Sequence, residues 1–412
     1  MLSHLALLVL AAPVLAAQAP VSLPLARQFR TPNGRLSDYD KQRGQALRTQ
    51  QENRRPSSAH TNHPSSRSRT SVPATNAAVT YTLPVGFGEP PKNFSLLIDT
   101  GSSNTWIAFD ASYIPMPESA KDAAATQPVT IEYGSGSFTG VEVIAPVTLA
   151  TDLFVQSQSI GTGAPYDIDI EGILGLGPVD LTQGTLLLSP DETIPTITDN
   201  LFAQHSISEE VVSIYFAPTT MLSVVNGELT FGGVDETKFT SKVHYAPVTM
   251  IQPAGSYWGI EQSISYGGEE IMSQNAGIAD TGTTLLNIPS DAFAIYQKKT
   301  GATMDQTTGL LTISEEQFQN LVDLEFNISG KTFYLTPDAQ IWPQELNTEI
   351  GGQAGSIYLI IADSGVNSGS GLDFINGYVF LERYASVYDT SKNRVGFAHT
   401  AWTDAKVNKI AN

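Results

Sequence analysis

Two short segments of the chain share one pattern of residue types that could perform chemistry as a pair. Each is an apolar run that leads into Asp-Thr-Gly and two hydroxyl residues. The segments are 96–103 (Leu-Leu-Ile-Asp-Thr-Gly-Ser-Ser) and 277–284 (Gly-Ile-Ala-Asp-Thr-Gly-Thr-Thr). Two carboxylates that face one water cannot both ionise readily. We therefore predict that Asp99 and Asp280 share one proton and act together as base and acid.

The residues beside these two aspartates suit loops that approach a substrate. Gly101 and Gly282 have no Cβ and allow close approach of the backbone, and Thr100 and Thr281 can brace their loops through the hydroxyl group. The structural alternative is that the two aspartates only cap nearby amides in turns. Two copies of the pattern in matching contexts favour a shared chemical role.

The elements that must position these loops are short strands. The chain has 34 Gly and 24 Pro, and only 15% of its residues are charged, which is typical of many strands joined by turns. Apolar or alternating runs form two series, and short helices are expected at 290–299 and 314–321, each opened by a Ser that could cap it. The runs are 79–87, 94–98, 129–133, 137–143, 211–216 and 228–231, then 243–264, 285–288, 310–313, 324–335, 356–361 and 387–398. We therefore predict a mainly β fold of two similar lobes, 71–243 and 244–412.

The first 70 residues differ from the rest in charge. They hold ten Lys or Arg and three acids, a net of +7, whereas the remaining residues have a net charge of −26. Residues 1–17 combine an apolar run with small residues at its end and predict a secretory signal peptide. We interpret residues 18–70 as a basic pro-segment that is attracted to the acidic body.

A polar stretch separates this leader from the first lobe. Residues 50–75 are rich in Ser, Arg, Asn, His and Pro and cannot form a core, so they predict an exposed linker. Arg54 with Arg55, and Arg67 with Arg69, offer cleavage sites, and the mature chain would begin near Ser71. An ordinary disordered tail without processing is the alternative.

Several classes of site are excluded or disfavoured by composition. The 412 residues include no Cys, which excludes disulfides, thiol catalysis and thiolate metal sites. Beyond the leader, His205, His244 and His399 have no ligand spacing, and no phosphate-binding loop occurs, so we expect neither a metal nor a cofactor. The acidic body should repel nucleic acid and anionic membranes, and no later segment is long and apolar enough to anchor the chain. We expect a secreted, extracellular monomer.

Together these segments resemble the pepsin-like aspartic proteases, and especially the cysteine-free fungal polyporopepsin type. The resemblance extends from Ser71 onward. Residues 131–137 (Ile-Glu-Tyr-Gly-Ser-Gly-Ser) match the flap, the hairpin that closes over the substrate in that family. Trp106 stands where the family has a Trp that holds the flap tyrosine, here Tyr133. Residues 173–175 (Ile-Leu-Gly) match the element that passes beneath the first active loop.

The resemblance implies a bilobal fold with a deep cleft and an endopeptidase that hydrolyses extended protein or peptide segments at acidic pH. It also implies synthesis as a zymogen whose pro-segment acts as an intramolecular inhibitor. Asp99 and Asp280 would be catalytic, sharing one proton as such pairs do in this family. Substrate contacts are implied for Gly101, Tyr133, Gly134, Ser135, Gly282 and Thr283, and supporting roles for Thr100, Ser102, Trp106 and Thr281.

Some positions depart from the family pattern or have another reading. Asn376 stands where the family prefers an apolar residue, and Tyr378 stands where several members have an acid, so the pH optimum does not carry over. Taken alone, Tyr133 could belong to an ordinary turn and Trp106 to the core. Asn93 and Asn327 begin glycosylation triplets.

Two rival functions remain open from the sequence. A glycosidase also uses two carboxylates, and a catalytically inactive binding protein could share the scaffold. The paired Asp-Thr-Gly loops with a flap are not expected of the first, and the second usually loses one of the loops.

Overall fold

The computed structural model describes residues 18–29, 34–54, 79–108, 127–133, 136–166, 168 and 170–410. The predicted signal peptide, residues 55–75 of the predicted linker with the three residues that follow, and the flap residues Gly134 and Ser135 lie outside the described residues. No helix within the described ranges is long and apolar enough to cross a membrane.

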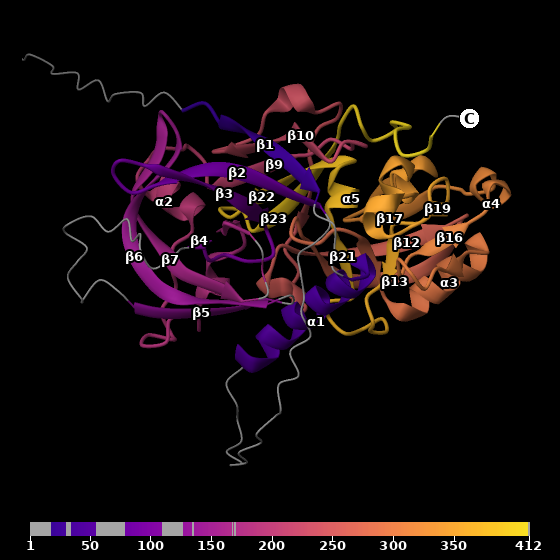
Figure 1. Cartoon of the computed structure of the whole chain (residues 1–412), viewed down its shortest axis with the longest axis horizontal. Helices are drawn as coiled ribbons and strands as arrows, with labels where there is room; N and C mark the ends of the chain where they lie inside the picture. The colour runs from indigo at the N-terminus through magenta and orange to yellow at the C-terminus, as the bar shows by residue number, and fades with distance from the viewer. Residues whose placement is uncertain are drawn as a thin grey trace, which may run out of the picture.

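The described chain is mainly β and forms two lobes, which confirms the predicted fold class (Figure 1). A 13-stranded sheet has the order β11-β23-β22-β9-β10-β1-β2-β3-β8-β4-β7-β6-β5. Its strands are β1 (Val21–Phe29), β2 (Val79–Phe87), β3 (Lys92–Asp99), β4 (Trp106–Ala108), β5 (Gln127–Tyr133), β6 (Gly136–Ala150), β7 (Leu153–Tyr166), β8 (Gly172–Gly175), β9 (Val211–Tyr215), β10 (Ser223–Phe231), β11 (His244–Pro247), β22 (Tyr384–Asp389) and β23 (Arg394–His399). This sheet therefore joins strands from both ends of the chain.

The second lobe contains a 7-stranded sheet, β18-β17-β12-β13-β21-β14-β20, and a 3-stranded sheet, β15-β16-β19. Its strands are β12 (Gly259–Tyr266), β13 (Glu269–Ala279), β14 (Leu286–Ile288), β15 (Thr303–Met304), β16 (Leu311–Ile313), β17 (Leu324–Ile328), β18 (Lys331–Leu335), β19 (Ile357–Tyr358), β20 (Ile361–Asp363) and β21 (Phe374–Asn376). The helices of the body are α2 (Ile197–Ala203), α3 (Ser290–Thr300), α4 (Glu315–Gln319) and α5 (Tyr378–Leu381).

Both helices predicted from sequence form, but only one has the predicted cap. Ser314 precedes α4, and its hydroxyl accepts a hydrogen bond from the Gln317 amide, as expected. The cap prediction for Ser290 is wrong. Ser290 is the first helical residue of α3 rather than the residue before it, and its hydroxyl bonds to Asp363.

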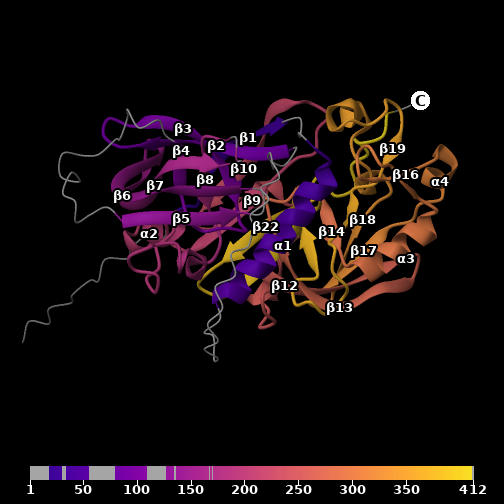
Figure 2. The same ribbon diagram turned by 60° about the horizontal axis from the view of Figure 1, so that its bottom comes forward.

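Two elements of the N-terminal leader were not predicted. β1 lies inside the large sheet, hydrogen-bonded to β10 on one side and to β2 on the other. α1 (Leu36–Arg54) runs between the magenta and the orange lobes in both views (Figures 1 and 2). The predicted linker therefore begins too early, because residues 50–54 are helical.

The strands that carry the two aspartates have matching surroundings. β3 pairs in parallel with β8, and β13 pairs in parallel with β21. The last four residues of β3 and of β13 are buried. Each aspartate thus stands at the end of a strand that is packed on both faces, which holds its backbone rigidly.

Candidate active site

Asp99 and Asp280 lie side by side, and the side chains of both are fully buried. The Asp99 carbonyl accepts a hydrogen bond of 2.8 Å from the Leu176 amide, and the Asp280 amide donates one of 3.2 Å to the Asn376 carbonyl. Two strands that meet between the lobes thus bring together the two aspartates of the repeated motif. We call them the dyad.

The threonines of the two loops brace the loops against each other. The Thr281 hydroxyl donates to the Ile98 carbonyl at 2.8 Å, and the Thr100 hydroxyl donates to the Ala279 carbonyl at 3.2 Å. Each of these hydroxyl oxygens also accepts a hydrogen bond of 3.0 Å from the amide of the other threonine. The bracing therefore runs between lobes, and it fixes the separation of the two aspartates.

Each carboxylate has a hydroxyl and an amide partner from its own loop. The Ser102 hydroxyl donates to Asp99 Oδ2 at 2.6 Å, and the Thr283 hydroxyl donates to Asp280 Oδ2 at 2.5 Å. The Gly101 and Gly282 amides donate to the other oxygen, Oδ1, at 3.0 and 2.9 Å. These bonds orient the two carboxylate planes.

Glycine is required at the third position of both loops by contacts across the dyad. A Cβ on Gly101 would lie 2.5 Å from Asp280 Oδ1, and a Cβ on Gly282 would lie 2.6 Å from Asp99 Oδ1. Any larger residue would push the carboxylates apart. The two glycines thus permit the shared site.

One guanidinium from the leader lies between the two carboxylates. Arg43 of α1 donates from Nη2 to Asp99 Oδ1 at 2.6 Å, from Nε to Asp280 Oδ2 at 2.7 Å, and from Nη2 to Asp280 Oδ1 at 2.9 Å. Charge-assisted bonds of this length are among the stronger ones in proteins. Sequence reasoning missed Arg43, although it did predict that the basic leader is attracted to the acidic body.

The electrostatics of the dyad follow from burial and from this guanidinium. Burial raises the pKa of Asp99, against the charge of Arg43. Burial would also raise the pKa of Asp280, but the charge and two hydrogen bonds of Arg43 lower it below its ordinary value. The negative charge of Asp280 adds to the rise in the pKa of Asp99, whereas Arg43 makes two of its three hydrogen bonds to Asp280. Burial would lower the pKa of Arg43 itself, yet the two carboxylates raise it, so the guanidinium stays charged.

Further contacts fix α1 beside the dyad. The buried Asp40 carboxylate accepts hydrogen bonds from the Leu285 amide at 2.6 Å and the Thr284 amide at 3.2 Å. Burial raises the pKa of Asp40 to about 7 in spite of these bonds. Lys41 Nζ lies 3.1 Å from the Asp363 carboxylate. These contacts attach the helix to the second lobe directly before Arg43 in the sequence.

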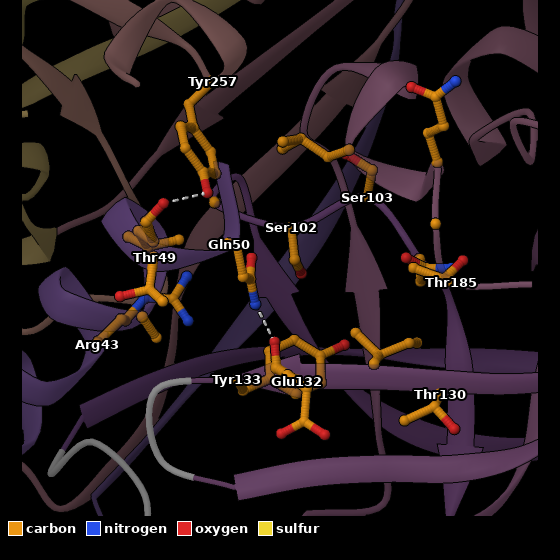
Figure 3. A pocket seen from close by; sticks show the side chains of 18 of the residues that line it. Arg43, Thr49, Gln50, Ser102, Ser103, Thr130, Glu132, Tyr133, Thr185 and Tyr257 are labelled. Atoms are coloured by element: carbon orange, nitrogen blue, oxygen red, sulfur yellow. Dashed lines mark hydrogen bonds between the residues drawn. The ribbon is translucent and has the colours of Figure 1, made fainter. Parts of the chain in front are cut away.

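The predicted flap is the hairpin of β5 and β6, with Gly134 and Ser135 outside the described residues. The Trp106 indole nitrogen donates to the Tyr133 hydroxyl at 2.7 Å. The Gln50 amide at the C-terminal part of α1 donates to the Glu132 carbonyl (Figure 3). The leader therefore contacts both the dyad and the flap.

A cavity of about 1130 Å³ remains beside α1, between the flap and residues 181–191. Gly101, Ser102 and Tyr133 are among the residues that line it, together with Thr185 and Tyr257 (Figure 3). Gly282 instead lines a smaller cavity of about 40 Å³ with Tyr39 and Asp40 of α1. The helix thus divides the space over the dyad.

Asn376 and Tyr378, the two residues that depart from the family pattern, both lie next to polar partners. The Asn376 amide exchanges two hydrogen bonds of 3.0 and 3.2 Å with the Gln262 amide, and both side chains are fully buried. Tyr378 is buried, with its ring 5.9 Å from the guanidinium carbon of Arg27.

The remaining sequence-predicted positions lie away from the dyad. Asn93 in β3 and Asn327 in β17 are exposed. Among the described residues, no group of three or more His, Cys, Asp or Glu could hold a metal ion.

Comparison with known proteins decides the family. The family model described as "Eukaryotic aspartyl protease" matches residues 80–400. The chain belongs to the eukaryotic aspartyl protease family. This confirms the resemblance drawn from the two loops and the flap, and the protein is a pepsin-like aspartic endopeptidase.

Individual relatives agree with this assignment. Polyporopepsin of Irpex lacteus is 52% identical over 342 residues, which cover 82% of this chain and 99% of that protein. Gastricsin of Cavia porcellus is 32% identical over 338 residues, which cover 77% of this chain and 79% of that protein. The crystal structure of the aspartic proteinase from Irpex lacteus matches with a TM-score of 0.76 at 51% identity, covering 80% of this aspartyl protease and 96% of that chain.

Proposed function

We propose that this protein is the proenzyme of a secreted endopeptidase that cleaves extended protein or peptide segments at acidic pH, with Asp99 and Asp280 as its catalytic pair. One observation carries the proposal. Both carboxylates are buried at the meeting point of two matching loops, and one guanidinium from an upstream segment binds them together.

Catalysis would begin once Arg43 leaves and a water takes its place between the carboxylates. The ionised carboxylate removes a proton as this water attacks the scissile carbonyl, and the protonated carboxylate donates a hydrogen bond to the developing oxyanion. The proton belongs to the pair rather than to one aspartate. The bonds from Ser102 and Thr283 support this role, because they hold the carboxylates in place before the reaction.

The substrate would lie as an extended strand in the space that α1 now divides. We assign its backbone contacts to Gly101, Gly282 and Thr283 below, and to Tyr133, Gly134 and Ser135 of the flap above. The bond between Trp106 and Tyr133 supports this assignment, since it holds the flap tyrosine over the cleft.

The leader would act as the inhibitor of its own enzyme. We propose a signal peptide at 1–17, a pro-segment at 18–70, lobes at 71–243 and 244–412, and a monomeric product that begins near Ser71. Below a pH of roughly 4.5, ordinary carboxylates start to take up protons while arginine keeps its charge. The attraction between leader and body then declines. Cleavage between Arg54 and Thr75 would follow, made by the enzyme itself or by a protease specific for dibasic sites.

Glycosylation at Asn93 and Asn327 is part of the proposal for a secreted protein, and the exposure of both side chains supports it. Treatment with an N-glycosidase should lower the mass of the secreted product. An unchanged mass would remove this part of the proposal.

The test uses purified full-length protein held at neutral and at acidic pH. We expect no activity at neutral pH, and at acidic pH a loss of mass that precedes activity on denatured casein and is blocked by pepstatin. The Asp99→Asn form separates self-cleavage from processing by another protease. Full activity of the uncleaved protein at acidic pH would contradict the inhibitory role of residues 18–70.

A further inference from the structure

Arg48 is a second arginine of α1 that is buried against the enzyme body, and the residue is only 9% exposed. Its Nε donates to the Leu372 carbonyl at 2.9 Å, and its Nη1 lies 3.5 Å from the Ser364 carbonyl oxygen. Its Nη2 is also buried and has no hydrogen-bond partner among the described residues. The body therefore holds a guanidinium here by two backbone carbonyls alone.

Two carboxylates of the body add negative charge beside these carbonyls. Asp363 ends β20, and Asp373 directly precedes β21. Burial lowers the pKa of Arg48, and the charges of Asp373 and Asp363 act against that shift. Lys41 of α1 lies 3.1 Å from Asp363 as well. Two cations of the leader thus interact with the segment 363–373, which contains two Asp and no Lys or Arg.

The Asp363 carboxylate is held mainly by partners that do not belong to the leader. The Ser290 hydroxyl donates to its Oδ1 at 2.5 Å, and the Gly365 amide donates to the same oxygen at 2.8 Å. Burial would raise the pKa of Asp363, but the bonds from Ser290, Gly365 and Lys41 lower it below its ordinary value. Because Ser290 and Gly365 stay when the leader leaves, the carboxylate remains suited to carry a charge at acidic pH.

The Asp373 carboxylate is likewise fixed within the body. Its Oδ1 accepts hydrogen bonds from the Gly369 and Ser370 amides, both at 2.8 Å, and from the Ser370 hydroxyl at 3.0 Å. In the part of the chain that the structure describes, no Lys or Arg of the body forms an ion pair with Asp363 or Asp373. Removal of the leader therefore leaves two preformed carboxylates without their cations.

The packing of α1 places this pocket close to the dyad. A Cβ on Gly44, the residue after Arg43, would lie 3.4 Å from Arg48 Nη1 and 3.4 Å from Ile375 Cδ1. Ile375 belongs to β21, which pairs in parallel with the strand that leads to the second active loop. In the proposed function the scissile bond takes the place of Arg43. Since an extended chain advances about 3.3 Å per residue, a side chain within about three residues of that bond would reach the pocket.

We propose that Asp363, Asp373 and the carbonyls of Ser364 and Leu372 form a subsite of the active enzyme that binds a Lys or Arg side chain of the substrate. The inference rests on the proposed function and adds a substrate class to it, namely segments with a cation near the cleaved bond. Arg48 occupies the subsite in the uncleaved protein and leaves it with the leader. Because all four groups are hydrogen-bond acceptors, they select a cationic donor and disfavour an acidic side chain.

The experiment measures kcat/KM for quenched peptides with full-length protein that has been activated at acidic pH. The peptides share one apolar cleavage site and carry Lys, Arg, Met or Glu at one of the three positions on either side of it. The assay is run at about pH 5, where ordinary carboxylates are mostly ionised. At one position we expect Lys or Arg to raise kcat/KM about tenfold over Met, which is the size of one charge-assisted hydrogen bond, and Glu to lower it.

The dependence on position separates a subsite from general attraction. A gain below about twofold at every position would overturn the proposal. An equal gain at all positions would also overturn it, because the net negative charge of the body attracts any cationic peptide. If no peptide is cleaved, the proposed function fails and the subsite with it, whereas cleavage without a preference for Lys or Arg overturns the subsite alone.

Substitutions test which residues form the subsite. Asp363→Asn and Asp373→Asn should each reduce the preference for Lys over Met at that position to below about threefold. The preference is a ratio of two rates in the same variant, so a partial loss of folded enzyme cancels. The matched control is Asp404→Asn, which removes an equal charge from an exposed residue bonded to Tyr334 and should keep the tenfold preference. An undiminished preference in both subsite variants would overturn the proposal.

Discussion

The inhibitory role that we propose for Arg43 leads to a prediction that can be worked from its contacts. In Arg43→Met, the side chain keeps its approximate length but loses the charge and all three hydrogen bonds to Asp99 and Asp280. The Asp40 contacts and the ion pair of Lys41 with Asp363 remain. The helix should therefore still dock, but more weakly.

The size of the effect follows from the burial of the site. The Arg43 side chain is only 14% exposed, and both carboxylates are fully buried. Removing one partner of such a buried pair typically costs about 3–5 kcal/mol. The dyad can take up a proton when Arg43 is absent, which offsets part of this cost, so we use the lower end. About 3 kcal/mol corresponds to a shift of about 100-fold or more in the equilibrium between docked and released α1.

The assay is the initial rate of cleavage of a quenched peptide by full-length protein at about pH 5.5, before any loss of mass. Uncleaved Arg43→Met should be about 100-fold more active than the uncleaved parent. Arg35→Met should remain latent, because Arg35 directly precedes α1 and its ion pair is with Asp38 of that helix rather than with the dyad. If uncleaved Arg43→Met is as inactive as the parent while the cleaved form is active, Arg43 does not block the dyad.

Three further predictions concern the flap, the pH dependence of stability and the absence of a cofactor. Tyr133→Phe removes the hydrogen bond between Trp106 and Tyr133. Because one hydrogen bond contributes about 1 kcal/mol, we expect kcat/KM to fall about tenfold while Tm changes little. Unchanged kinetics would reduce Tyr133 to a turn residue. Burial raises the pKa of Glu142 to about 7. The contribution of Glu142 to the free energy of unfolding is therefore complete below its ordinary pKa of 4.5 and is lost as the pH rises through about 7. The parent should lose about 3 kcal/mol of unfolding free energy across that window, and urea unfolding of Glu142→Gln should lack this share of the loss; identical pH slopes would contradict it. EDTA and reducing agents should leave activity unaltered, and inactivation by EDTA that a divalent ion reverses would count against the mechanism.

The dyad could be predicted from sequence because its signal is local. Asp99 and Asp280 each stand within a contiguous motif whose residue types are set by contacts inside or between the two loops. The close approach of Gly101 to Asp280 explains why glycine is needed there. Such a pattern needs no knowledge of the rest of the fold.

The helix α1 could not be predicted in the same way. Its buried apolar side chains are Leu36, Tyr39 and Leu47, which do not form a broad apolar face. Its other contacts with the body are polar and come from Asp40, Arg43, Arg48 and Gln50. Its charged residues instead indicate an exposed segment. Only the partners far along the chain, Asp280 and Leu285 among them, explain why these side chains are buried.

Some strands were missed for a related reason. β7 contains Gly161 and Gly163, which in a sequence indicate a turn. In the sheet they allow close packing, since a Cβ on Gly163 would lie 2.3 Å from the Thr139 carbonyl oxygen. The pairing of Asn376 with Gln262 is likewise invisible in the sequence, because it joins residues on β21 and β12 that only the folded sheet brings together.

The central claim is that Asp99 and Asp280 form one catalytic unit, and substitution of each by asparagine tests it most directly. Asparagine preserves the shape of the side chain but cannot exchange the proton. Asp99→Asn and Asp280→Asn should each fold, as judged by an unchanged far-UV spectrum and a cooperative thermal transition. After removal of the leader by an added protease, each should retain less than about 1% of the parent kcat at acidic pH, since loss of one member disables the unit. Residual activity of more than a few per cent in either correctly folded variant would contradict the account.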